Sequence, residues 1–152
     1  MPKLGRDTVQ KWIESDGFEA YICPDCDGIH FPLWEEKEGV LESRCFVESS
    51  QCSMLVEFSI RASAVLPLQG AIHFMNYDFT FIKVMLSLSD HDIPRLLVTY
   101  ALPTEYLEQP MFSNWLSQYL QELEAIHKQL VDMEVLMLDN MEGLTDFDDL
   151  LH

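Results

Sequence analysis

The clearest pattern in this sequence is a two-residue alternation of apolar and polar positions, which is typical of half-buried β-strands. It runs from residue 40 to residue 47 and returns after a polar turn at residues 49–51, with one apolar side made by Cys52, Met54, Val56, Phe58 and Ile60. Similar runs cover residues 79–89 and 95–102, and shorter ones cover 18–22 and 29–33. The pattern predicts two antiparallel hairpins preceded by two short strands.

Spacings of three and four residues predict helices at both ends of the chain. Near the start, Val9, Trp12 and Ile13 share one face of a helix that Gly17 ends. The longest predicted element is a helix from residue 110 to about residue 139. Its apolar stripe consists of Phe112, Trp115, Leu116, Tyr119, Leu120, Leu123, Ile126, Leu130 and Val131. Residues 133–138 are apolar nearly all round, so this end of the helix needs a second packing partner.

The order of these elements predicts the fold class. Residues 61–68 either extend or leave the preceding strand, which Pro67 ends, and a short helix carrying Ile72 and Met75 is expected in the segment through Asn76. We therefore predict an α+β domain, an antiparallel sheet of about five strands packed by an N-terminal helix and a long C-terminal helix. Residues 1–140 form this single domain, and residues 141–152 form an acidic C-terminal tail.

Composition narrows the classes of partner. Apolar residues make up 48% of the 152, which indicates a folded domain with a core. Acidic residues outnumber basic ones 26 to 9 and give a formal net charge of -17, so we expect no nucleic-acid partner. The N-terminus has no apolar leader segment, and no apolar run is long enough for membrane insertion. We expect a cytoplasmic protein with reduced thiols.

A CPDC turn holds the most specific chemical signal in the chain. Cys23 and Cys26 flank two turn residues and can direct both thiolates at one metal ion, and His30 follows closely enough to add a nitrogen ligand. Cys45 and Cys52 would complete an all-thiolate zinc site, or His30 could replace one of the four. Both of these later cysteines also fit as small core residues of their strands. The alternative at the turn itself is a tight loop with reduced thiols.

Catalytic chemistry finds little support in the sequence. A CxxC turn can be redox-active, but here Asp25 and Asp27 are expected to raise the thiol pKa values, and the turn lies between strands rather than at a helix start. His91 lies in a polar turn, and His73 and His127 fit packing or surface positions. No Gly-x-Ser-x-Gly motif or phosphate-binding glycine loop occurs. We predict no catalytic residue and no enzymatic activity.

Two stretches together carry a family resemblance. The segment from Cys23 to Pro32 and the later RASAVLPL run from Arg61 to Leu68 resemble the YbjN-type bacterial proteins, and they occur in the same order. The resemblance implies an architecture similar to that of type III secretion chaperones. It also implies a role in sensory transduction regulation rather than in catalysis.

These observations together predict a non-enzymatic regulatory or chaperone-like adaptor that binds a protein client or regulator and can form a homodimer. In the tail, Phe147, Leu150 and Leu151 have near-helical spacing and are the predicted partner-binding residues. The alternative function is a small zinc-binding or redox-sensing protein that uses Cys23 and Cys26. No cofactor other than this zinc is expected.

Overall fold

The computed structural model describes residues 4–89 and 92–138 of the chain. Short elements occupy the first third, and longer strands and helices follow. In chain order the elements are α1 (Arg6–Ser15), β1 (Tyr21–Ile22), β2 (Ile29–His30), α2 (Pro32–Glu35), β3 (Val40–Val47), β4 (Gln51–Ser59), the 3-10 turn η1 (Ala62–Ala64), α3 (Val65–Asp78), β5 (Lys83–Ser87), β6 (Arg95–Pro103) and α4 (Gln109–Asp132).

All strands join one antiparallel sheet in the order β1-β2-β3-β4-β6-β5. This confirms the α+β class, with six strands where about five were expected. Strand β4 is central because it pairs with β3 on one side and with β6 on the other. The alternation seen in the sequence buries the side chains of Cys52, Met54, Val56 and Phe58 completely.

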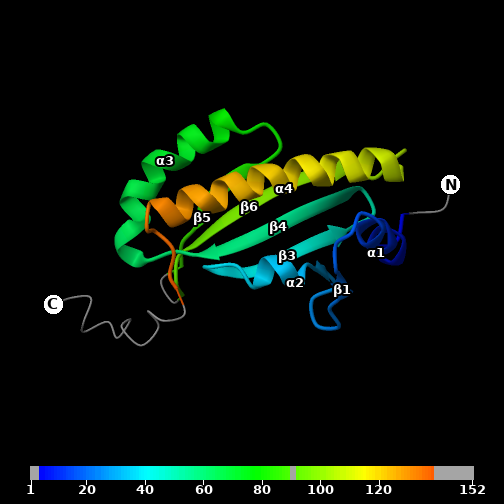
Figure 1. Cartoon of the computed structure of the whole chain (residues 1–152), viewed down its shortest axis with the longest axis horizontal. Coiled ribbons are helices and arrows are strands. Elements are labelled where there is room, and N and C mark those ends of the chain that lie inside the picture. Colours follow the sequence, from blue (N-terminus) through cyan, green and yellow to red (C-terminus); the bar gives the residue numbers. More distant parts are fainter. Residues whose placement is uncertain (1–3, 90–91, 139–152) are drawn as a thin grey trace.

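Helix α4 crosses the sheet on one face (Figure 1). Eight of the nine residues in its predicted apolar stripe are buried, whereas Val131 is 37% exposed. Phe112, Leu116, Tyr119 and Leu123 are fully buried. The Tyr119 hydroxyl donates a hydrogen bond of 2.7 Å to the carbonyl of Val98 in β6, so its polar atom is satisfied inside the core. The three-four spacing therefore places one side of α4 against the sheet, as the sequence predicts.

Helix α1 packs against the start of α4. The rings of Trp12 and Phe112 have their centroids 5.5 Å apart. Val9 and Ile13 are fully buried, and the chain leaves the helix through Gly17, whose φ of +94° suits glycine. The predicted first helix is confirmed in position and in its buried face.

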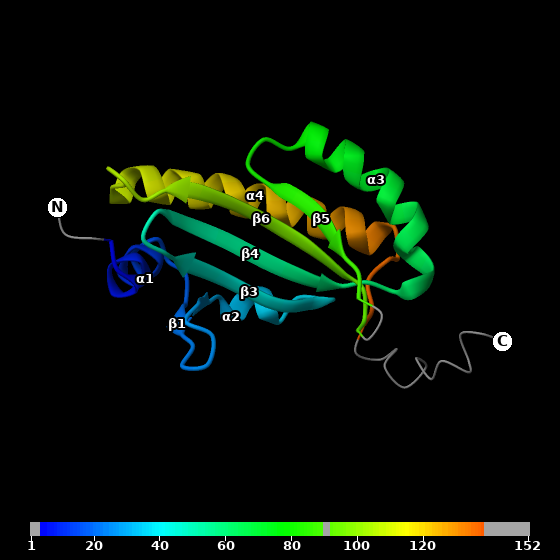
Figure 2. The ribbon, with the colours of Figure 1, turned by 180° about the vertical axis from the view of Figure 1, so that it is seen from behind.

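The other face of the sheet carries a charged row. Figure 2 views the molecule from this side, where β3, β4 and β6 lie in front of α4. Glu57 lies between two arginines, with Arg44 Nη2 2.7 Å and Arg95 Nη1 3.2 Å from its carboxylate oxygens. These pairings join β3, β4 and β6 by side chains as well as by their backbone ladders.

The end of α4 differs from the prediction. The helix ends at Asp132 rather than near residue 139, and Glu134 takes a positive φ of 58°. The following chain then pairs with the end of β4, because Leu136 forms an antiparallel bridge with Ile60. Val135 and Leu136 become buried in this way. The apolar surface that a continued helix would leave exposed is covered by this change of direction.

Two other segments correct the predicted strands. The strand expected at 29–33 ends at His30, because Pro32 is the first residue of the short helix α2, a favourable helix-starting position. The RASAVLPL run leaves the strand, one of the two predicted alternatives, and β4 ends at Ser59 rather than at Pro67. The run forms η1 and then the first turn of α3, a helix of 14 residues where only a short one was expected.

Among the described helices, none is both long and apolar enough to span a membrane. The predicted tail, with Phe147, Leu150 and Leu151, lies outside the described residues, as does His91.

Candidate functional site

The CPDC turn connects β1 to β2 and projects from the edge of the sheet. The strands pair Tyr21 with His30, and the Cys23 amide donates to the Gly28 carbonyl at 3.0 Å, which closes the loop. Asp27 completes the turn with a φ of +61°, and Arg6 of α1 donates to its carbonyl at 3.2 Å. The loop is thus held from two sides.

The turn brings Cys23, Cys26 and His30 together. One potential ligand atom from each lies within 4.8 Å of the other two. The Cys26 sulfur and His30 Nε2 are 3.1 Å apart. Both thiols are partly exposed, whereas His30 is buried with 6% exposure. The structure therefore assembles the three residues that the sequence analysis placed at the turn.

Glu35 is a functional candidate that sequence reasoning missed. Its carboxylate oxygens lie 3.1 and 3.2 Å from Nδ1 of His30, on the side of the ring opposite Cys26. The short helix α2 turns the chain back and places Glu35 there. Pro32 was the available signal, because proline favours the first turn of a helix. The Tyr21 ring stacks on the imidazole at 4.9 Å and an interplanar angle of 10°, which fixes the ring plane.

The electrostatics of the turn contradict one expectation. The pKa of the Cys26 thiol is lowered from 9.0 to about 7, mainly by its hydrogen bond with His30 and next by the Gly28 backbone. The acidic neighbours were expected to raise it. The Asp27 side chain instead interacts with Arg6, at 3.3 Å. For His30, burial lowers the pKa, but the interactions with Cys26 and Glu35 outweigh it and raise the pKa overall.

Cys45 and Cys52 form a separate pair inside the core. Their sulfurs are 3.7 Å apart, and both side chains are fully buried between β3, β4 and the helical layer. The hydrogen bond with Cys52 and burial raise the pKa of Cys45 well above its ordinary value. The group of ligand atoms found among the described residues contains neither of them. The structure thus divides the four cysteines into two pairs rather than one tetrahedral set.

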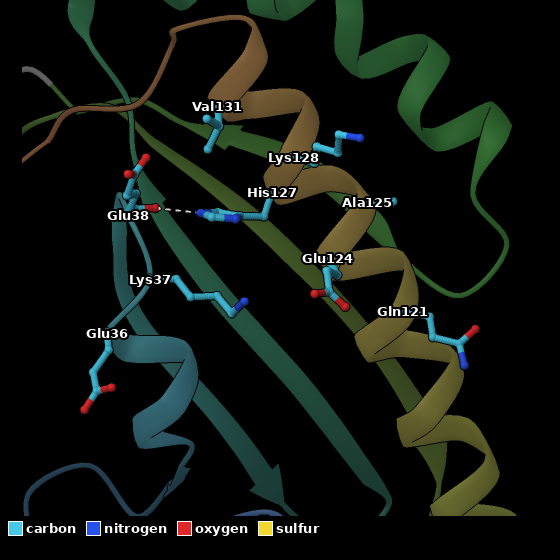
Figure 3. Close-up of a pocket in the computed structure, with 9 residues that line it drawn as sticks. All are labelled: Glu36, Lys37, Glu38, Gln121, Glu124, Ala125, His127, Lys128 and Val131. Carbon is cyan, nitrogen blue, oxygen red and sulfur yellow. Dashed lines mark hydrogen bonds between the residues drawn. The ribbon is translucent and has the colours of Figure 1, made fainter.

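A groove separate from the CPDC turn lies between α2 and α4 (Figure 3). Two adjoining cavities of about 710 and 600 Å³ form it. They share Glu36, Lys37, Gln121 and Glu124 as lining residues. The rest of the lining combines apolar residues, namely Phe18, Leu33, Trp34, Leu120, Ala125 and Val131, with polar ones, namely Glu38, Ser117, His127 and Lys128.

His127 anchors one wall of this groove. Its Nε2 lies 2.9 Å from the Glu38 carbonyl, and its ring stacks on Phe58 with centroids 5.9 Å apart. The Lys37 ammonium lies 4.6 Å from the centre of the Trp34 ring. Of the packing and surface positions that the sequence left open for His127, the structure shows packing, and the side chain also ties α4 to the turn after α2.

Helix α3 carries a second exposed apolar surface. Leu66, Phe74 and Tyr77 are 79%, 65% and 84% exposed and follow one another at helical spacing. His73 of the same helix stands at the surface beside Phe74.

The fold defines an α+β protein with one six-stranded antiparallel sheet, and comparison with known proteins identifies its family. Residues 5–130 match the YbjN family, described as "Putative bacterial sensory transduction regulator". The chain belongs to this family. It is 26% identical over 98 residues to "Uncharacterized protein YbjN" of Escherichia coli K12, covering 64% of this chain and 62% of that protein. The Shigella flexneri protein of the same description matches equally.

Solved structures support the fold. A crystal structure described as "YbjN, a putative transcription regulator from E. coli" superposes with a TM-score of 0.82 at 21% identity, covering 89% of this chain and 96% of that one. An uncharacterized protein from Methanothermobacter thermautotrophicus has a TM-score of 0.55 at 11% identity, covering 87% and 99% of the two chains. At these identities the likeness establishes the architecture alone.

Proposed function

We propose that this YbjN family member is a regulatory protein that acts by binding a basic, amphipathic segment of a partner protein in the groove between α2 and α4. One observation carries the proposal. The groove combines an apolar lining with carboxylates at its edge, and it continues through two adjoining cavities. A helix or an extended segment binds to such a surface by burying an apolar face and leaving its polar face at the rim.

The apolar part of the groove contains side chains that folding has left accessible. Leu33 is 57% exposed and Val131 is 37% exposed, at opposite ends of the groove. Trp34 forms the wall between them and is already held by its contacts with Lys37 and His127. A partner that covers such side chains gains about 25 cal/mol for each Å² of apolar surface removed from water.

The charges favour a basic partner. Glu36, Glu38 and Glu124 line the groove, while one of its two lysines, Lys37, already lies over the Trp34 ring. The whole chain carries a formal net charge of -17. Such a field speeds the approach of cationic segments and slows that of anionic ones. Binding is therefore expected to weaken as salt is added.

This mode of action agrees with the regulator description of the family and requires no catalytic step. The match spans 62% of the curated relative's length, so a protein-binding role for this chain is our proposal rather than a property transferred from that protein.

The test uses the full chain as bait in extract of its native cell, with two variants that add the same charge to the same helix. Ala125 is exposed and lines the groove, so Ala125→Arg fills and charges it. Gln129 is exposed on α4 outside the groove lining, so Gln129→Arg is the matched control. Circular dichroism should show the same fold for all three. Quantitative mass spectrometry then compares the proteins that each bait retains.

The proposal expects a protein that the wild-type chain and Gln129→Arg retain and that Ala125→Arg loses. A purified segment of that protein should be basic and amphipathic and should bind with the same selectivity. Equal retention by all three baits would refute the groove as the contact. A fourth bait, Phe74→Ser, tests the exposed surface of α3, and loss of the partner in this variant alone would assign the contact to α3.

In the same assay, a variant with serine at Phe147, Leu150 and Leu151 together tests the predicted tail contact. Light scattering tests homodimer formation.

A further inference from the structure

We propose that Cys23, Cys26 and His30 bind one zinc ion and that Glu35 is the positioning residue that holds His30 for it. The proposal is independent of the groove and rests on the first hairpin and its contact with α2. Two thiolates and one imidazole supply three of the four ligands of a tetrahedral site. Within the described residues the group has these three members, which leaves one position for an exchangeable ligand.

The distances fit a shared ion. Zinc lies about 2.3 Å from a thiolate sulfur and about 2.0 Å from a histidine nitrogen, so tetrahedral angles separate two such ligand atoms by about 3.5–3.8 Å. Here the Cys26 sulfur and His30 Nε2 are 3.1 Å apart, and every pair in the group lies within 4.8 Å. Small rotations of the partly exposed cysteine side chains bring the sulfurs to the required spacing.

Glu35 settles which nitrogen of His30 can bind a metal. A carboxylate only accepts hydrogen bonds, so Glu35, 3.1 Å from Nδ1, places the ring proton on that nitrogen. Nε2 faces Cys26 and donates to it in the metal-free chain, so a metal ion that displaces this proton meets the Nε2 lone pair while Nδ1 stays protonated. Histidines that ligate zinc almost always donate their second ring N–H to a carboxylate, a backbone carbonyl or water, and Glu35 supplies such a partner. Stacking of Tyr21 on the ring restricts its rotation.

The donor set selects the kind of metal. Magnesium and calcium prefer oxygen ligands, whereas thiolate with imidazole suits zinc, which has no geometric preference of its own and adopts the tetrahedral arrangement. The backbone supports the same choice, because the loop is closed by the Cys23 amide and the Gly28 carbonyl and anchored by Arg6. A hairpin whose strands have two residues each would gain order from a metal that joins its turn to β2.

The experiment titrates the full chain with Co²⁺ alone, and then with Zn²⁺ alone, after reduction and removal of metal by a chelator. Co²⁺ reports geometry through its visible absorption and reports thiolate ligands through near-ultraviolet charge-transfer bands. We expect one equivalent of Co²⁺ with tetrahedral visible bands and charge transfer, displaced by one equivalent of Zn²⁺. Weak binding to the many surface carboxylates would lack the charge-transfer bands.

Variants then assign the ligands. Cys26→Ser and His30→Phe are expected to lower the affinity at least a hundredfold, with weaker charge transfer in the first. Glu35→Gln should lower the affinity by about 10- to 100-fold while keeping one equivalent and the same band positions, as expected of a positioning residue. Cys52→Ala removes a buried thiol outside the group and is the matched control, expected to bind like the wild type.

Two results would overturn the proposal, and both can be obtained with chains that circular dichroism shows to be folded. The first is a fully reduced wild-type chain that takes up no stoichiometric Co²⁺ or Zn²⁺. The second is charge transfer that persists unchanged in Cys26→Ser but disappears in Cys52→Ala. Retention of a partner in the groove assay decides nothing here, so failure of the metal site and failure of the proposed function can be told apart.

Discussion

The two cysteine pairs of this chain occupy opposite environments. Cys23 and Cys26 lie in a partly exposed turn beside His30, whereas Cys45 and Cys52 lie side by side in the core. The pKa of Cys26 is lowered to about 7, chiefly by its hydrogen bond with His30. The pKa of Cys45 is raised well above its ordinary value by its contact with Cys52 and by burial.

The difference shows that the neighbours, and not the residue type, decide what a thiol can do. A thiolate needs a cation or hydrogen-bond donors to be stable, and the turn supplies both through the imidazole and the backbone. In the core, the neighbouring thiol and burial disfavour charge on Cys45. We therefore assign reactivity or metal binding to the turn pair, Cys23 and Cys26, and a packing role to the strand pair, Cys45 and Cys52. Alkylation, its pH dependence and the stability of variants test this division.

The largest expected effect is in alkylation of the native, metal-free chain by iodoacetamide at pH 7. Cys26 should react readily, while Cys45 and Cys52 react only when the core opens. For a domain of ordinary stability this protects them about a thousandfold or more. Peptide mass spectrometry measures the rate at each cysteine. Comparable rates at the two pairs would show that the strand pair is accessible, contrary to its full burial.

The next effect concerns the pH dependence of that reaction. Only the thiolate reacts, so the Cys26 rate should rise with pH and reach half its maximum near pH 7. In His30→Phe, which keeps an aromatic ring but has no donor, the midpoint should move up toward the ordinary value of 9.0. At pH 7 the thiolate population would then fall by up to about fiftyfold. An unchanged midpoint would mean that His30 is not the group that lowers the pKa.

Substitutions of the core cysteines should lower the free energy of unfolding more than substitutions of the turn cysteines, the reverse of the order expected for alkylation. Cys52→Ser places a hydroxyl in a fully buried position and should lower the free energy of unfolding by about 1–3 kcal/mol. Cys23→Ser, in the partly exposed turn, should change it by about 0.5 kcal/mol or less when metal is absent. Urea denaturation with reductant and chelator measures both. Equal losses would remove the distinction between a packing thiol and a turn thiol.

The smallest expected effect comes from the contact between Glu35 and His30. The folded-state pKa of His30 is raised, so the contact stabilises the fold below the ordinary pKa of 6.5 and loses this contribution as pH rises through the folded-state value. Glu35→Gln should therefore be less stable than the wild type by about 0.5–1 kcal/mol between about pH 5 and 6.5, with a smaller difference above. A difference in unfolding free energy between the wild type and Glu35→Gln that grows above pH 7 would contradict this prediction. Urea denaturation at several pH values measures this difference, and an NMR titration should show a lower His30 pKa in the variant.

Sequence patterns predicted the buried sides of most elements. Alternation identified Cys52, Met54, Val56 and Phe58 as one face of a strand, and this face is fully buried. The CxxC spacing predicted that Cys23 and Cys26 would converge with His30, which the hairpin brings about. These predictions hold because period and turn spacing depend on residues close together in the chain.

Other features required the assembled molecule. The end of α4 depended on a bridge between Leu136 and Ile60, residues from distant parts of the chain. Gly39 leaves room for that segment, since an added Cβ there would lie 2.8 Å from a Leu136 methyl carbon. The sequence also left open whether Cys45 and Cys52 join the turn cysteines as metal ligands or pack in the core, and pairing between β3 and β4 encloses them in the core.

The α+β class, most of the buried stripe of α4 and the cysteine turn follow from the sequence alone, because each depends on residues close together in the chain. The contact of Glu35 with His30, the contact of Cys45 with Cys52 and the groove between α2 and α4 arise only when the chain is folded. These contacts join separate elements, and their distances follow from how the helices pack on the sheet. No local pattern encodes that packing, because it depends on which buried faces meet.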